Sequence, residues 1–136
     1  MAKYRVLIID DSLTIRALLE GVISRHSDFR VVGAASSVAS ARQMMTDLLP
    51  TVITLDLAMP DVDGIGFLDE LVKQRHAPIL VLSSSTTAGS AARDEALLHG
   101  AHACFDKARI LSDSAGLLRR LKATADGNWH LAKGWH

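Results

Sequence analysis

The sequence has a single cysteine, Cys104, no excess charge of either sign and no long apolar run. One cysteine excludes an internal disulfide and a zinc site built from several cysteines, and we expect it to be buried as a small apolar side chain. Fifteen basic and fifteen acidic residues give a formal net charge of zero, which speaks against binding to nucleic acid or an anionic membrane. The apolar runs are too short to span a membrane and no signal peptide is evident, so we expect a cytoplasmic protein.

The length of 136 residues, with 49% hydrophobic residues, is typical of one globular domain. No repeat, low-complexity segment or shift in composition marks an internal boundary. We therefore expect one domain over residues 1–124, followed by a short tail over residues 125–136. Such a tail leaves no room for an output domain.

Short apolar runs alternate five times with amphipathic segments. The runs predict strands at 4–9, 29–35, 51–56, 78–83 and 101–105. The segments between and after them predict helices at 13–26, 38–49, 64–76, 91–100 and 113–125. The first, third and fourth runs are rich in Val, Ile and Leu without polar alternation, as in strands buried on both faces. The pattern predicts an α/β fold with a parallel sheet, right-handed crossovers and helices on both faces.

Polar side chains follow the predicted strands at their carboxyl ends, where open parallel sheets bind ligands. They are Asp10 and Asp11 after the first strand, Asp56 at the end of the third, Ser83 and Ser84 at the fourth, and Asp106 with Lys107 after the fifth. We interpret Asp106 as a solvated loop charge, and His99 and His102 as surface side chains. The chain order thus gathers three carboxylates, two hydroxyls and one ammonium at one edge of the sheet.

These side chains at the strand ends predict a bound metal ion and a type of reaction. Asp10, Asp11 and Asp56 bring three negative charges, and Lys107 brings one positive charge. A divalent cation would cancel the remaining negative charge. Oxygen ligands suit a hard ion, so we expect Mg²⁺, or Mn²⁺ in its place. A metal beside a carboxylate, a lysine and a hydroxyl is equipment for phosphoryl transfer. Asp56 is the predicted nucleophile, and Ser83 and Lys107 would bind the phosphoryl oxygens.

Five segments together resemble the receiver domain of bacterial two-component response regulators. They are "LIIDDS", "LDLAMPDVDG", "PILVLSSS", "HGAHA" and "DK", and they follow the family's order on the expected elements from Val6 to Lys107. Within the family, "ITLDLAMP" and "SSSTTAGS" are most similar to the receivers attached to chemotaxis methylesterases. The resemblance implies a flavodoxin-like (βα)5 fold with strand order 2-1-3-4-5.

The resemblance also implies a role for each polar group at the strand ends. Asp56 would be the phosphoacceptor, Asp10 and Asp11 the magnesium-binding pair, the backbone carbonyl of Ala58 a further metal ligand, Ser83 the switch hydroxyl with Ser84 beside it, and Lys107 the phosphate partner. The domain would catalyse only its own phosphorylation and dephosphorylation.

The resemblance implies partners as well. The phosphoryl donor would be a sensor histidine kinase or a phosphotransfer protein. Phosphorylation would alter the face formed by the fourth helix, fifth strand and fifth helix, and so control binding to another protein or a phosphorylation-dependent dimer. We expect a stand-alone receiver without a DNA-binding or esterase domain.

Two positions depart from the family pattern. Cys104 stands where an aromatic residue is usual, and adjacent Phe105 should point to the other face of the sheet. In the family this aromatic ring moves together with the switch hydroxyl, and we do not extend that coupled movement to this sequence. Ala108 stands where a proline usually follows Lys107. Without proline a cis bond would cost roughly 2.5 to 4 kcal/mol, so we predict a trans bond and a rearranged loop.

Two other functions stay open. A degenerate receiver would keep the fold and act as a constitutive binding module, but such domains usually lack the acidic pair, the acceptor or the lysine, and all are present here. A magnesium-dependent phosphatase with an aspartyl nucleophile would commonly place a second acid two residues after Asp56, where Ala58 stands. A flavin-binding protein of this architecture is disfavoured, because the carboxylates of "DDS" would repel a phosphate.

Overall fold

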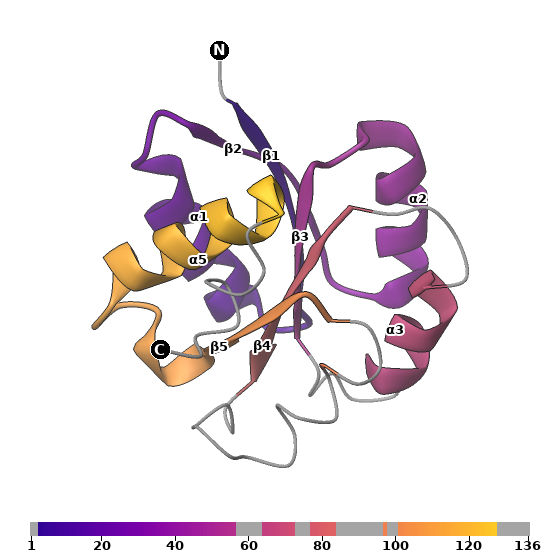
Figure 1. Cartoon of the computed structure of the whole chain (residues 1–136). Coiled ribbons are helices and arrows are strands. Elements are labelled where there is room, and N and C mark those ends of the chain that lie inside the picture. The colour runs from indigo at the N-terminus through magenta and orange to yellow at the C-terminus, as the bar shows by residue number, and fades with distance from the viewer. Residues whose placement is uncertain (1–2, 57–63, 73–76, 84–96, 98–100, 128–136) are drawn as a thin grey trace.

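The runs of branched aliphatic residues form the strands of one parallel sheet (Figure 1). The computed structural model describes residues 3–56, 64–72, 77–83, 97 and 101–127. The strands are β1 (Tyr4–Ile9), β2 (Phe29–Ala35), β3 (Val52–Asp56), β4 (Ile79–Ser83) and β5 (Ala103–Asp106). Their order is β2-β1-β3-β4-β5 and all neighbours are parallel, which confirms the predicted topology.

Helices cover both faces of the sheet, as the alternating pattern predicts. They are α1 (Leu13–Ser24), α2 (Val38–Leu48), α3 (Gly64–Val72), α5 (Ser114–Asp126) and the short 3-10 helix η1 (Lys107–Arg109). Figure 1 shows α1 and α5 on one side of the sheet and α2 and α3 on the other. The fourth predicted helix lies outside the described residues except for Leu97, which is helical. No helix among the described segments is long and apolar enough to cross a membrane.

Side-chain caps decide where three helices begin. The Ser12 hydroxyl accepts a hydrogen bond from the backbone N–H of Ile15 at 3.2 Å and starts α1. Ser37 caps α2 in the same way, and an Asp113 carboxylate oxygen caps α5. Short polar residues at these positions satisfy backbone donors that the helix leaves unpaired. The cap at Ser12 starts α1 immediately after the two aspartates that follow β1.

Two apolar cores lie on opposite faces of the sheet. The core beneath α1 and α5 includes Ile8, Leu80, Phe105 and Leu121, each at most 3% exposed. The core beneath α2 and α3 contains Leu7, Ile53, Phe67 and Cys104, among other residues. Neighbouring strand residues therefore face opposite layers, which explains the unbroken aliphatic runs. Cys104 is 3% exposed, as predicted, and Phe105 packs in the opposite core.

Several predicted boundaries differ from the structure by one or two residues. Helix α1 ends at Ser24 rather than His26, because the His26 N–H turns back to the carbonyl of Ile23 at 3.2 Å. Helix α2 ends one residue early, where Leu49 adopts a left-handed φ of 49°. The fifth strand begins at Ala103 and continues through Asp106. Turn geometry of this kind has no strong signature in the residue types involved.

His102 is half-buried, so its interpretation as a surface side chain is wrong. Its Nδ1 atom accepts a hydrogen bond from the backbone N–H of Ile79 at 3.0 Å. Its own backbone N–H donates to the Ile79 carbonyl at 2.9 Å. The imidazole thus ties the start of β4 to the residue that precedes β5. His99 lies outside the described residues.

Tyr4 connects the first strand to the last helix. Its hydroxyl donates to the Asp126 carboxylate, with the two oxygens at 2.8 and 3.0 Å, and its ring stacks on Phe29 with centroids 5.0 Å apart. Burial raises the pKa of the Tyr4 phenol above its usual 10.0, and the hydrogen bond to Asp126 raises it further. The folded protein therefore holds the phenol proton more tightly than the unfolded chain does.

We predict that Tyr4→Phe lowers the free energy of unfolding by about 1 kcal/mol near neutral pH, because it removes one hydrogen bond to a carboxylate. A raised folded-state pKa contributes stability that is complete below the unfolded pKa and is lost as pH rises through the folded pKa. The stability difference between wild type and Tyr4→Phe should therefore shrink above pH 10.0. Urea denaturation of both proteins near neutral pH and above pH 10.0 measures this difference in the free energy of unfolding. A difference that grows with pH would contradict a raised pKa for the Tyr4 phenol.

Candidate functional site

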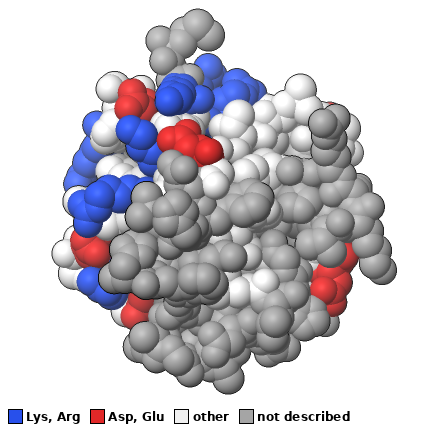
Figure 2. All heavy atoms as spheres, viewed as in Figure 1, with Lys and Arg blue, Asp and Glu red and all other residues white. Residues whose placement is uncertain are grey.

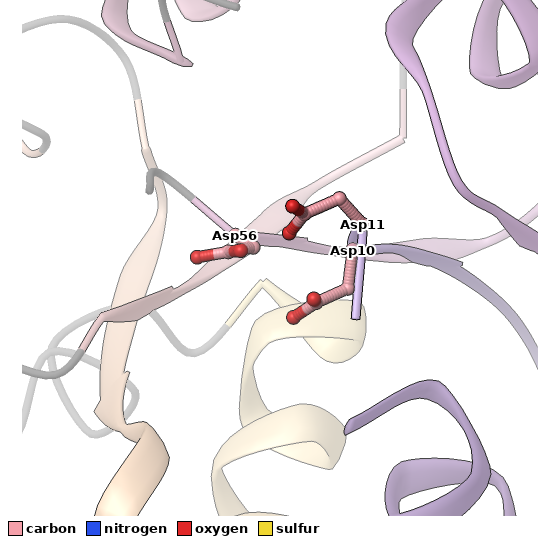
Figure 3. A group of neighbouring side chains, drawn as sticks. All are labelled: Asp10, Asp11 and Asp56. Carbon is pink, nitrogen blue, oxygen red and sulfur yellow. The ribbon is translucent and has the colours of Figure 1, made fainter. Parts of the chain in front are cut away.

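The three carboxylates predicted from the strand ends lie together at one edge of the sheet. Asp10 and Asp11 follow β1, and Asp56 ends the neighbouring β3, where Ile9 pairs with Leu55. One oxygen of each aspartate lies within 4.8 Å of the others. Figure 3 shows the three side chains turned toward a common space. Asp10 and Asp56 are buried, at 0% and 1% exposure, whereas Asp11 is exposed.

The loop after β1 holds Asp10 through two further residues. Asp10 Oδ1 accepts a hydrogen bond from the Ser12 backbone N–H at 2.9 Å. The Arg16 guanidinium donates to the Asp10 backbone carbonyl at 2.8 Å. Sequence analysis assigned Arg16 no role, and its position one turn into the first predicted helix was the only available signal. Arg16 brings a cation next to the acidic loop and ties that loop to α1.

Lys107 is the cation that the structure places among the carboxylates. Its ammonium lies 3.4 Å from Asp10 Oδ2 and 3.3 Å from Asp56 Oδ2. Lys107 directly follows β5, and β4 lies between β5 and β3. Its side chain therefore crosses the end of β4 to reach two buried carboxylates, and it is 18% exposed.

Asp10 is under electrostatic stress in this arrangement. Burial raises the pKa of the Asp10 carboxyl and the neighbouring Asp56 charge adds to the rise, while the Ser12 N–H and Lys107 act in the opposite direction. Among the described residues, Asp10 Oδ2 has no hydrogen-bond donor, and the Lys107 contact of 3.4 Å is longer than an ordinary N–H···O bond. A buried carboxylate oxygen without a donor is costly.

The donor set fits a hard divalent cation. The grouped side chains offer carboxylate oxygens, which magnesium and manganese prefer. A cation there would satisfy Asp10 Oδ2 and reduce the repulsion among the three aspartates. Ala58, whose backbone carbonyl is a predicted further ligand, lies outside the described residues. The three predicted carboxylates therefore lie close enough together to share one cation.

The predicted hydroxyl also lies at this edge of the sheet. Ser83 ends β4 and is 7% exposed. Asp56 pairs with Leu82 in the β3–β4 ladder, so Ser83 lies one residue beyond the strand partner of Asp56. It pairs in turn with Asp106 of β5. Ser84 lies outside the described residues.

Asp106 is not the solvated loop charge that the sequence suggested. It ends β5, is half-buried, and accepts a hydrogen bond from the Ala108 backbone N–H to Oδ1 at 2.9 Å. This bond caps η1, through which the chain turns after the sheet. The described residues contain no cis peptide bond, which confirms the trans bond predicted after Lys107. A proline in place of Ala108 would have no N–H for this cap.

Arg120 of α5 is a second residue that sequence analysis missed. Its guanidinium donates to the Cys104 backbone carbonyl at 2.7 Å and lies 5.5 Å from the centroid of the Phe105 ring. Such a contact combines a charged hydrogen bond with a cation–π interaction. Arg120 thereby holds β5 against α5 just before Lys107.

Known proteins are similar to this chain in sequence and in fold. A sequence model of the response regulator receiver domain matches residues 6–114. Protein-glutamate methylesterase/protein-glutamine glutaminase 1 of Caulobacter vibrioides is 42% identical over 107 residues, which are 79% of this chain and 31% of that protein. The chain thus spans about a third of the length of such curated relatives.

Solved structures agree. The crystal structure of the response regulator domain of Thermotoga maritima CheB has a TM-score of 0.80 at 30% identity, covering 90% of this chain and 96% of that one. A chain in the crystal structure of the P1 domain of CheA3 in complex with CheY6 from R. sphaeroides has a TM-score of 0.78 at 28% identity, covering 91% and 98%. With a family match that reaches all five strands and the three clustered aspartates, this chain belongs to the response regulator receiver domains, and its likeness to the receivers of chemotaxis methylesterases is confirmed.

Proposed function

We propose that this receiver accepts a phosphoryl group on Asp56 in a magnesium-dependent reaction and signals by phosphorylation-dependent binding to a protein. The observation that carries the proposal is the setting of Asp56. Its carboxylate is buried at the end of β3, 3.3 Å from the Lys107 ammonium and beside Asp10 and Asp11. Membership of the receiver family supports the same role for this residue.

In this proposal Asp10, Asp11, Asp56 and the Ala58 carbonyl would hold a magnesium ion, which would neutralise charge on the phosphoryl oxygens. Asp56 attacks the phosphorus, so a bond forms between its carboxylate oxygen and phosphorus while the bond from phosphorus to the donor breaks. The leaving group carries away the bonding electrons and takes up a proton from water. Lys107 exchanges its contact with the Asp56 carboxylate for one with a phosphoryl oxygen. The Ser83 hydroxyl lies at the same edge and donates to another.

The donor that we propose is a phosphohistidine on a sensor kinase or a phosphotransfer protein. A chain of this fold occurs in a crystal structure with the P1 domain of CheA3, which supports a donor of that class. We propose that the output surface is the face that β5 and α5 form with the fourth helix, where a target protein or a second copy would bind. Figure 2 shows Lys and Arg side chains interspersed with Asp and Glu on the side where α1 and α5 lie, so this side offers charges of both signs to a partner.

Two forms of output remain compatible with the proposed site. The phosphorylated receiver could bind a separate target protein. The curated relatives are named as methylesterases and glutaminases and are about three times longer than the aligned segment, so a receiver linked to such an enzyme would regulate it through the same aspartate. In both forms the receiver itself turns over no substrate other than its own phosphoryl group.

The first prediction from this proposal is that acetyl phosphate with magnesium adds one phosphoryl group to the wild-type protein and none to Asp56→Ala. Intact-protein mass spectrometry with magnesium or with a chelator measures this. Asp47→Ala is the matched control, because Asp47 is an exposed aspartate on α2, and it should be labelled like the wild type. Labelling of Asp56→Ala would place the acceptor elsewhere.

The same experiment separates the other functions. No adduct on the wild type, at any magnesium concentration, would favour a degenerate receiver that binds its partner constitutively. Repeated release of phosphate from small phosphomonoesters would favour a phosphatase. A stoichiometric adduct without turnover supports the receiver mechanism.

The second prediction concerns the charge at Asp10. Without metal, Asp10→Asn should raise the free energy of unfolding by about 1 kcal/mol, because it removes one of two buried carboxylates that share the Lys107 ammonium. Magnesium should stabilise the wild type by binding the folded state, and should stabilise Asp10→Asn much less. Thermal unfolding in chelator and in magnesium measures both effects.

Asp11→Asn is the matched control for this prediction. Asp11 is exposed, so its substitution should leave the metal-free stability nearly unchanged while still weakening the response to magnesium. A metal-free Asp10→Asn protein less stable than the wild type would show that the Asp10 charge stabilises the fold, contrary to the argument from burial.

A further inference from the structure

A hydrogen bond spans the backbone of Lys107. Asp106 Oδ1 accepts from the Ala108 N–H at 2.9 Å, so the acceptor and the donor belong to the residues on either side of the lysine. Asp106 has extended backbone angles, φ −77° and ψ 119°, and η1 begins at the next residue. The Asp106 carboxylate therefore fixes the turn from which the Lys107 side chain departs.

The position of the Lys107 ammonium depends closely on the backbone conformation of that turn. It lies 3.4 Å from Asp10 Oδ2 and 3.3 Å from Asp56 Oδ2, although the lysine begins at the end of β5, beyond β4. A lysine side chain has several rotatable bonds and carries its charge at the far end. A small rotation of the backbone at Lys107 therefore displaces the ammonium substantially at the carboxylates.

Packing holds the chain on both sides of the turn but not within it. Upstream, Asp106 pairs with Ser83 in the β4–β5 ladder. Downstream, Ile110 is fully buried, and its N–H lies 3.4 Å from the Lys107 carbonyl. Between these anchors, Ala108 and Arg109 are exposed and contribute no core packing. Arg109 is tied to the start of α5 by its 3.3 Å ion pair with Asp113 and by the 2.9 Å bond from the Asp113 N–H to the Arg109 carbonyl. Of the described contacts in this interval, the Asp106 cap is the one that spans Lys107 itself.

We propose that Asp106 is a positioning residue for Lys107, because its bond to the Ala108 N–H sets the turn that aims the ammonium at Asp10 and Asp56. This inference rests on the proposed function, since it concerns how the same site binds a phosphoryl group. Asp106 acts through Lys107 and touches no reacting atom. Its role requires a carboxyl or amide oxygen at position 106 and a backbone N–H at position 108.

The test uses beryllofluoride, which mimics a phosphoryl group bound to an aspartate, titrated into the full chain at saturating magnesium and followed by fluorine NMR. Asp106→Ala should weaken beryllofluoride binding roughly tenfold, as expected when a charged group is misplaced by a fraction of an ångström. Magnesium affinity, measured separately, should be unchanged or tighter, because Lys107 repels the metal. Asp106→Asn keeps an oxygen for the cap and should restore binding.

Two controls separate positioning from general destabilisation. His26→Ala removes a side-chain-to-backbone bond of the same span, the 3.2 Å bond from the Asp28 N–H to His26 Nδ1, in the turn before β2. It should lower stability but leave beryllofluoride binding intact. In a Lys107→Ala background, Asp106→Ala should weaken binding no further, because the two substitutions remove the same contact.

Different results overturn different statements. Wild-type affinity in Asp106→Ala would overturn the positioning role alone, as would equal losses in Asp106→Ala and His26→Ala. Joint loss of magnesium and beryllofluoride binding in Asp106→Ala would show a purely structural role. Absence of magnesium-dependent beryllofluoride binding in the wild type would overturn the proposed function, and this inference with it.

Discussion

The ammonium of Lys107, shared by two buried carboxylates, is the interaction on which the arrangement of the site depends. Asp10 and Asp56 end adjacent strands, and their negative charges repel each other in a place that water scarcely reaches. One cation cannot balance both, so Asp10 retains an oxygen without a donor among the described residues. The folded domain is therefore prepared for additional positive charge. A metal ion, and the phosphoryl group that we propose, would meet carboxylates whose positions the strands already fix.

The order of the strands explains which residues can share this site. Strand β1 lies between β2 and β3, so the acidic pair that follows it stands directly beside Asp56. Strand β5 lies at the edge of the sheet, and only a long side chain can reach back across β4. The residue types follow from these distances: short carboxylates at the ends of the central strands, a hydroxyl at the end of β4, and a lysine just after the outermost strand. The parallel sheet converts positions that are far apart in sequence into one site.

Much of the fold was predictable because apolar periodicity and strand ends are local features of the sequence. The positions of Asp10, Asp56 and Lys107 followed from those strand ends and from the parallel topology. The sequence did not reveal the half-buried setting of His102, because that contact depends on the register between β4 and the residue before β5. It also did not reveal the Asp106 cap or the contacts of Arg16 and Arg120, which depend on local turns and on how helices dock. Residue type alone does not distinguish a solvated charge from one that binds a backbone group.

The hydrogen bond between Tyr4 and Asp126 has an architectural consequence. It joins the first residue of β1 to the last residue of α5, so both ends of the described fold meet at the amino ends of the strands. The aspartates lie at the opposite, carboxyl ends. A segment attached beyond either end of the described fold therefore starts at the opposite end of the sheet from the three aspartates. A structural change at the aspartates would therefore have to be transmitted along the sheet or along α5 to reach the start of such a segment.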